Sequence, residues 1–177
     1  MTKSRLSGYR TRRDEYFATD EHSPLSDGDR PVFKGLAYFD ERPDLAFQLE
    51  IDERGDDVGE RIELPTANNA VKQFIRAGRV HFEVDGQPAK LTVFKDVERG
   101  RFFLPFKDAT AGKETYSVGR YLDPQKRPDG KLVVDFNYAY NPYCAYSHGW
   151  SCPLTPFENI LPIRIEAGEK IPPLEHK

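Results

Sequence analysis

The sequence has few residues of several kinds, and each shortage excludes a class of protein. The chain of 177 residues holds one methionine and two cysteines, so it is not a disulfide-rich scaffold of the small secreted type. No stretch approaches the roughly 18 consecutive apolar residues that a membrane-spanning helix requires. The N-terminus is basic but lacks the apolar stretch of about 7–15 residues that an export signal carries. These absences predict a cytoplasmic protein that does not cross a membrane.

A large excess of charge of one sign is also missing. Lysine and arginine number 26 against 29 aspartates and glutamates, which gives a formal net charge of -3 and a pI near 5.9. Domains that bind nucleic acid usually have a pI above about 9 or a basic stripe, so the sequence predicts no nucleic-acid partner. It gives no indication of an oligomeric state. We interpret the one local basic excess as the solvated face of a helix, and it consists of Lys3, Arg5, Arg10, Arg12 and Arg13.

Aromatic rings, prolines and glycines are abundant instead. The chain has 12 phenylalanines, 9 tyrosines, 14 prolines and 13 glycines. Rings and β-branched side chains favour sheet, whereas frequent proline and glycine interrupt long helices. The length fits one domain, since domains hold roughly 100–200 residues. The composition therefore predicts a single, mainly β domain over residues 1–177.

The spacing of apolar residues predicts the individual elements. A short helix is expected over residues 4–17, where apolar side chains recur every three to four positions behind the N-cap Ser4. A β-rich body is expected over residues 31–136, with a hairpin turn at Asp85-Gly86 and His81 on the polar face of its strand. The expected strands cover residues 32–39, 45–51, 61–64, 80–84, 91–94, 101–106, 114–121, 131–136 and 161–166. So many short strands predict an antiparallel β-barrel or β-sandwich.

Regular alternation ends at residues 137–160, where we expect a long irregular loop rich in cysteine, proline and aromatic residues. Three prolines exclude a helix there, and the rings are too apolar for a free linker. A loop of about 20 residues in a compact domain is usually functional or held down by its own side chains. A final strand and turn at 161–170 and a tail at 171–177 complete the expected organisation.

Both cysteines of the chain, Cys144 and Cys152, lie in this loop and flank His148. They could form a disulfide, although a cytosolic compartment keeps most thiols reduced. Together with His148 they could bind zinc and leave one open coordination position. Alternatively, one cysteine is a nucleophile with His148 as its base and Asn141 or Asn159 as the orienting residue. The interpretation without chemistry is that both thiols are small buried apolar groups.

Six runs of sequence stand out as motifs: GLAYF at 35–39, FLPFKDATAG at 103–112, TYSVGRYLD at 115–123, YNPYCAY at 140–146, CPLTPFEN at 152–159 and IRIEAGEK at 163–170. Together they resemble the signature of a prokaryotic family known as domain of unknown function 1684. The resemblance extends over nearly the whole chain and implies no activity. It does imply motif positions, which in this sequence are Gly119, Arg120, Tyr121, Asp135, Asn141, Pro142, Cys144, Cys152, Pro153, Pro156, Glu158 and Asn159. Because His148 is not among them, the resemblance puts the three-ligand zinc site in doubt and leaves only the cysteine pair as candidate ligands.

A polar set at expected strand ends and in the loop forms the candidate ligand site. Its members are Arg120, Tyr121, Asp135, Asn141, Glu158 and Asn159. The guanidinium of Arg120 could grip a carboxylate or phosphate with two parallel hydrogen bonds. Alternatively it pins the loop to the sheet through an ion pair, because buried charges are normally paired. The expected partners of that ion pair are Asp123, Asp135 or Glu158.

These patterns favour a β-domain that binds a small anionic molecule in an aromatic-lined pocket beneath the loop. Two other hypotheses stay open. The first is an enzyme that uses Cys144 and Cys152 as a nucleophile, a redox pair or a zinc site. The second is a structural or partner-binding module in which the loop only closes the core.

Overall fold

The fold begins with one α-helix, α1 (Arg5–Thr19), in a computed structural model that describes residues 4–174. The hydroxyl of Ser4 accepts a hydrogen bond from the amide of Ser7 at 3.1 Å, which caps the start of the helix. The helix expected over residues 4–17 is therefore confirmed, and it extends to Thr19. Within the described residues no helix is long and apolar enough to span a bilayer. Lys3 and the last three residues of the expected tail lie outside the described range.

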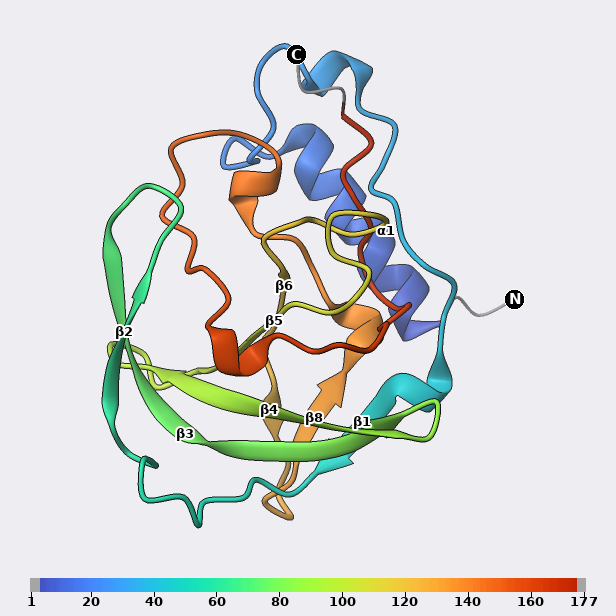
Figure 1. Cartoon of the computed structure of the whole chain (residues 1–177). Coiled ribbons are helices and arrows are strands. Elements are labelled where there is room, and N and C mark those ends of the chain that lie inside the picture. Colours follow the sequence, from blue (N-terminus) through green and yellow to red (C-terminus); the bar gives the residue numbers. More distant parts are fainter. Residues whose placement is uncertain (1–3, 175–177) are drawn as a thin grey trace.

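Two antiparallel sheets follow α1 (Figure 1). The three-stranded sheet has the order β1-β8-β7, with β1 at Ala46–Leu49, β8 at Leu132–Asp135 and β7 at Gln125–Lys126. The five-stranded sheet has the order β2-β3-β4-β5-β6, with strands at Arg61–Pro65, Val71–Val84, Gln87–Asp96, Phe102–Phe106 and Arg120–Leu122. This second sheet curls into a half-barrel. The mainly β, antiparallel prediction is confirmed, and a half-barrel with a small second sheet is the form that it takes.

The long β3–β4 hairpin is the element that the sequence specifies most directly. Asp85 and Gly86 both adopt positive φ angles, 50° and 79°, which is the turn geometry that fits the twist of a two-residue hairpin. Val84 pairs with Gln87 across this turn. Apolar residues of β3 point into the core in alternation, while the side chain of His81 is 57% exposed, as its position on the polar face predicts. The hairpin runs across the lower part of the molecule in Figure 1.

Three of the expected strands are absent or shortened in the structure. Residues 32–39 contain only a single bridge between Tyr38 and Glu169. Of residues 114–121, only the part from Arg120 onward joins a strand. Residues 161–166 form no strand, although Leu161, Ile163 and Ile165 are buried in alternation as expected. The apolar pattern was thus interpreted correctly as an inward-facing one, but the strand assignment from it was wrong.

Residues 161–169 find their backbone partners in two places. The amide of Leu161 and the carbonyl of Ile163 bond residues 107–109, and the carbonyls that follow bond an arginine in place of a neighbouring strand. The main-chain carbonyls of Ile165, Ala167 and Glu169 all accept hydrogen bonds from the guanidinium of Arg120. Extended backbone usually satisfies its carbonyls through a β-ladder. Here one buried side chain satisfies three of them, so the segment stays extended and inward-facing without joining a sheet.

The irregular loop contains only short 3-10 helices and single bridges. Outside the loop, two other 3-10 helices, η1 (Arg30–Val32) and η2 (Pro43–Leu45), precede β1. The loop itself follows η3 (Phe136–Tyr138) and includes η4 (Tyr143–Ala145) and η5 (Phe157–Asn159). The ring of Phe17 on α1 packs against that of Tyr146, with centroids 4.8 Å apart. A second, smaller core therefore joins the helix to the loop.

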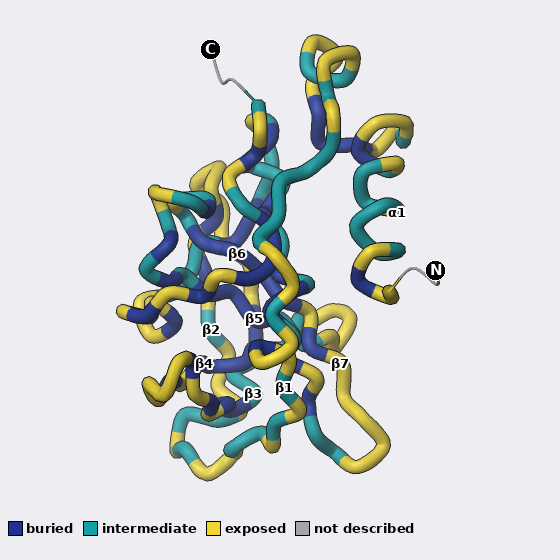
Figure 2. Tube along the Cα trace, turned by 90° about the vertical axis from the view of Figure 1, so that its right-hand side faces the viewer, coloured by how far each residue is buried: buried dark blue, intermediate teal, exposed yellow. Residues whose placement is uncertain are grey.

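Helix α1 lies at one side of the molecule, beside the C-terminal segment and away from the β3–β4 hairpin (Figures 1 and 2). The prediction that its basic residues form one solvated face is wrong in part. Arg13 pairs with the buried Glu169, and the guanidinium of Arg10 lies 4.3 Å from the ring centre of Tyr38. The two arginines turn inward because a buried carboxylate and a ring face are available to them, whereas Arg5 and Arg12 remain exposed.

Candidate functional site

A pocket of about 610 Å³ opens where the β4–β5 turn, the start of β3 and the irregular loop meet. Its volume is in the range of small-molecule sites, roughly 300–1,000 Å³. Five separate parts of the chain contribute to it: α1, β3, the β4–β5 turn with β5, β6 with the residues after it, and the loop. Its lining combines charged side chains, aromatic rings and one thiol: Arg13, Lys72, Phe74, Asp96, Arg99, Arg101, Phe103, Tyr121, Asp123, Tyr140, Tyr143, Trp150 and Cys152.

A continuous row of rings forms one wall of this pocket. Phe74 stacks on Phe103 with centroids 5.1 Å apart, and Phe103 meets Tyr121 edge-on at 4.8 Å. Tyr121 in turn meets Tyr140 at 5.8 Å. The hydroxyl of Tyr121 donates to the carbonyl of Pro153, and burial raises the pKa of this tyrosine. The rings are therefore fixed by packing and hydrogen bonding, and they offer a rigid apolar surface to a planar ligand.

The charges around the pocket are mostly positive. Four cationic side chains line it against two carboxylates, a formal net charge of +2 in a chain whose net charge is -3. Arg13 is paired with Glu169, but within residues 4–174 no ion pair involves Lys72, Arg99 or Arg101. The pocket therefore carries three exposed cations that no protein carboxylate pairs with directly.

The two carboxylates of the pocket are occupied by other partners. Asp96 caps the β4–β5 turn by accepting hydrogen bonds from the amides of Glu98 and Arg99 at 2.7 and 2.8 Å. Asp123 accepts a hydrogen bond from the hydroxyl of Tyr140 at 2.7 Å, and Arg101 acts on it only at longer range. Neither carboxylate forms an ion pair with the three unpaired cations, so the two negative charges offset the positive field only in part.

Both cysteines are free thiols; Cys152 lines this pocket, and Cys144, which does not line it, interacts with Cys152. Hydrogen bonding between them lowers the pKa of Cys152 and raises that of Cys144. The amides of Cys144 and Tyr143 and the charge of Lys72 lower the pKa of Cys152 further, against the effect of burial. The hydroxyl of Tyr116 donates to the sulfur of Cys144 at 3.8 Å. Cys152 is therefore the member of the pair that holds a thiolate more easily.

A protein-family model described as a protein of unknown function, DUF1684, matches residues 31–170. The chain belongs to the DUF1684 family. The resemblance of the six sequence motifs to this family is thus confirmed. The match includes every part of the pocket except Arg13 on α1.

A solved structure extends the likeness of this DUF1684 protein to its helix. The solution NMR structure of an uncharacterized protein from Haloarcula marismortui is 34% identical to the chain, with a TM-score of 0.70. The alignment covers 97% of this chain and 94% of the other. The comparison with curated proteins finds no match.

Arg120 lies in the core of the DUF1684 fold rather than at the pocket. Its side chain is 1% exposed, and its guanidinium bonds three carbonyls and the carboxylate of Asp108, the latter at 3.3 Å. The ion-pair partners expected from the sequence were wrong, because the true partner, Asp108, precedes it on the neighbouring chain segment. Both terminal nitrogens bond the protein, and the remaining Nε is buried without a partner, so a ligand has no access and the structure gives this arginine a scaffold role.

The predicted polar set is dispersed in the structure. Asn159 is fully buried and bonds the amide and carbonyl of Thr92, each at 2.8 Å. Glu158 accepts hydrogen bonds from Arg76 and Thr92, which outweigh burial and lower its pKa. Asp135 caps η3 and lines a different surface pocket. These residues hold η5 on β4 and shape the end of β8.

Asn141 supports the floor beneath the loop. Its side-chain amide donates to the carbonyl of Lys170 at 2.8 Å and to the hydroxyl of Tyr146 at 3.3 Å. Its main-chain amide donates to Glu169 at 2.7 Å. Of the six predicted ligand-binding residues, only Tyr121 lines the pocket.

The structure does not bring His148 to the two thiols. His148 is exposed, and no hydrogen bond joins it to either cysteine in the described part of the chain. Among residues 4–174 no group of three histidine, cysteine or acidic side chains is placed to hold a metal ion. The expected three-ligand arrangement of Cys144, His148 and Cys152 is therefore not formed.

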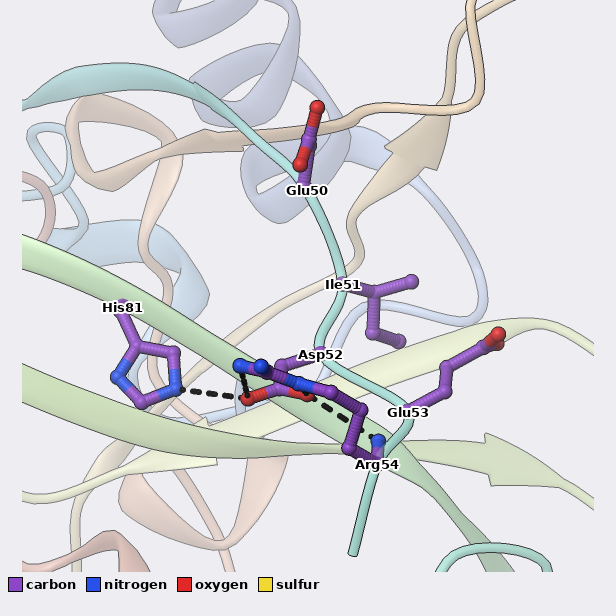
Figure 3. Close-up of a pocket in the computed structure, with 6 residues that line it drawn as sticks. All are labelled: Glu50, Ile51, Asp52, Glu53, Arg54 and His81. Atoms are coloured by element: carbon purple, nitrogen blue, oxygen red, sulfur yellow. Dashed lines mark hydrogen bonds and ion pairs between the residues drawn. The ribbon is translucent and has the colours of Figure 1, made fainter.

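A second surface depression, around Asp52, has a different character (Figure 3). The carboxylate of Asp52 accepts hydrogen bonds from Arg54 at 2.8 and 3.0 Å, and these bonds hold its pKa below its ordinary value. His81 lies 3.5 Å from the same carboxylate. Glu50 and Glu53 add only further negative charge, and the one ring that lines the depression is the imidazole of His81. It offers no surface that an aromatic anion would favour.

Lys72, Arg99 and Arg101 are the pocket residues that sequence reasoning missed. Arg99 and Arg101 flank Gly100 in a hairpin turn, where exposed charge is common and carries no signal of its own. Lys72 begins a strand more than twenty residues earlier in the chain. The register of β3 with β4, in which Phe74 pairs with Asp96, brings Lys72 beside the β4–β5 turn, and a bulge between Arg76 and Gly78 shifts that register.

Proposed function

We propose that this DUF1684 protein binds a small organic anion with an aromatic or planar part, in the pocket between the β4–β5 turn and the irregular loop. The observation that carries the proposal is the set of three unpaired cations beside a wall of packed rings. Planar guanidinium groups suit carboxylates and phosphates, and ring faces suit planar apolar groups. The ligand is therefore expected to be recognised by Arg99 and Arg101 rather than by Arg120.

The chain supplies its own reporter for this pocket. Trp150, the single tryptophan, lines it and packs on Tyr143 with centroids 5.0 Å apart. Energy transfer from Trp150 to anilinonaphthalene sulfonate, an aromatic anion that fluoresces when bound, should therefore measure binding at this place. The double variant R99Q/R101Q should weaken binding about twofold to thirtyfold, since each of the two exposed charge contacts contributes about 0.2–1 kcal/mol.

Two controls distinguish recognition of the negative charge from nonspecific hydrophobic binding. The variant K126Q/R127Q removes the same charge from exposed positions outside the pocket and should leave the affinity unchanged. N-phenylnaphthylamine, which lacks the sulfonate, should bind wild type and R99Q/R101Q equally. Equal losses for both probes, or no loss for either, would contradict the proposal. A thermal melt of each variant excludes binding to a loosened core.

The free thiols also support the cytoplasm as the compartment of this protein. Disulfides form and persist in oxidising compartments, whereas cytosolic thiols stay reduced. Cys144 and Cys152 lie close enough to interact and are nevertheless unbonded.

A further inference from the structure

A thiol that lines the pocket and interacts with a second thiol forms an arrangement that anion binding alone does not need. Cys152 lines the pocket, whereas Cys144, on η4, does not. The groups that act on the pair are Lys72, Tyr116 and Tyr121, of which only Lys72 is a cation. A structural pair of buried apolar thiols would require neither the lysine nor the amides that face the sulfur of Cys152.

We propose that Cys152 and Cys144 form a dithiol that reduces a small, negatively charged disulfide held in this pocket. The charge preference rests on the proposed function, because it comes from the same unpaired cations. The thiol chemistry depends only on the cysteine pair and not on these cations. The substrate class is a disulfide flanked by carboxylates, and an aromatic group next to its sulfur would fit the wall of rings.

The thiol–disulfide exchange takes place in two steps. The thiolate of Cys152 attacks one sulfur of the bound disulfide, a mixed disulfide forms on Cys152, and the other half of the ligand leaves as a thiolate. Cys144 then loses its proton to solvent and attacks the sulfur of Cys152, which releases the second half as a thiolate. The ligand gains two electrons, and the protein loses two as a bond forms between Cys144 and Cys152.

The order of the two cysteines follows from their positions. Only Cys152 lines the pocket, so a bound disulfide meets this sulfur first. The neighbouring amides and Lys72 stabilise the thiolate that must attack, and the same groups make thiols reactive in other proteins. Cys144 interacts with Cys152 and with the hydroxyl of Tyr116, so it is placed to attack the mixed disulfide on Cys152.

The loop between the two cysteines can close without moving the sheet. Seven residues separate them, including Trp150. Cys152 is anchored on the β2–β3 turn, where its carbonyl accepts a hydrogen bond from the amide of Ala67 at 2.9 Å. Cys144 lies on the short helix η4. Since the thiols already interact, the new bond requires only a local shift of η4, and Trp150 should report it as a change in fluorescence.

The test compares two disulfides on the full chain: the anionic dithiobis(nitrobenzoate) and the neutral dithiodipyridine. With less than one equivalent of either, wild type should end with no adduct and with a peptide in which Cys144 and Cys152 are joined, as seen by mass spectrometry. C144S should keep one adduct on Cys152. C152S should react about tenfold more slowly than C144S, because its remaining thiol does not line the pocket and is less acidic.

The charge variants then test the substrate class. R99Q/R101Q should slow the anionic reagent about threefold relative to the neutral one, and added salt should remove the difference. Lys72 is left in place because its charge also acts on Cys152, and K126Q/R127Q is the matched control. Failure of both reagents to join the cysteines would overturn the dithiol proposal and leave the anion pocket standing. Joining without any charge preference would overturn the anionic substrate class and would count against the proposed function as well.

Discussion

Replacing Arg120 with alanine is expected to lower the free energy of unfolding by about 3–5 kcal/mol, the usual cost of removing one partner of a buried ion pair. The variant leaves the carboxylate of Asp108, which is 4% exposed, without its cation. It also strips hydrogen bonds from three main-chain carbonyls of residues 165–169. For a domain of this size the melting temperature should fall by about 6–20 °C.

The matched control is R127A. Arg127 pairs with Asp129 at 3.3 Å, and its side chain is 41% exposed, so this loss should change the unfolding free energy by less than about 0.5 kcal/mol. R120K should recover only part of the stability, because an ammonium cannot reach all the acceptors that the guanidinium spans. A melting temperature unchanged in R120A, with anion binding lost, would show that Arg120 serves the ligand and would refute its scaffold role.

Glu169 is the second position where one side chain carries much of the structure, and E169A should also cost about 3–5 kcal/mol. Its side chain is 1% exposed and accepts from Nε of Arg13 at 3.0 Å. The amide of Asn141 and the hydroxyl of Tyr146 also donate to it, at 2.7 and 2.9 Å. Alanine would leave a half-buried arginine and two further donors without an acceptor, so urea unfolding should show a much lower midpoint.

E166A provides the comparison within the same segment. Glu166 pairs with Arg164, and both side chains are more than 40% exposed, so its removal should be nearly neutral. A double-mutant cycle of R13A and E169A should give a coupling free energy between about 0.5 and 3 kcal/mol. Additive effects of the two substitutions would mean that the Arg13–Glu169 pair does not join α1 to the C-terminal segment as described.

Local signals in the sequence predicted the parts of the fold that local physics decides. Ser4 begins the helix because its hydroxyl caps an unpaired amide, and Asp85-Gly86 turns the hairpin because both residues adopt positive φ. The segment at residues 161–166 shows where such reasoning ends. Its alternation correctly predicts which side chains are buried, but whether its carbonyls bond a strand or Arg120 depends on a residue more than forty positions away.

The candidate site likewise has residues that the sequence predicts and residues that it does not. The aromatic, cysteine-containing loop was singled out by its composition, and it does provide Tyr140, Trp150 and Cys152 to the pocket. Arg120 was chosen because an arginine beside a glycine in a motif suggests ligand contact, yet the same position suits a buried scaffold residue. The cations that remain free, Arg99 and Arg101, lie in the turn between β4 and β5 and carry no mark in the sequence.

The central claim is that the pocket of rings and unpaired cations is the ligand site, and chemical-shift mapping by NMR tests it most directly. Titration of labelled protein with anilinonaphthalene sulfonate should move the amide signals of Lys72, Arg101, Tyr121 and Cys152, with saturation at one common affinity. The signals of Asp52 and His81, in the other surface depression, should stay in place. Shifts centred on Asp52 and His81, with the pocket signals unmoved, would contradict the account.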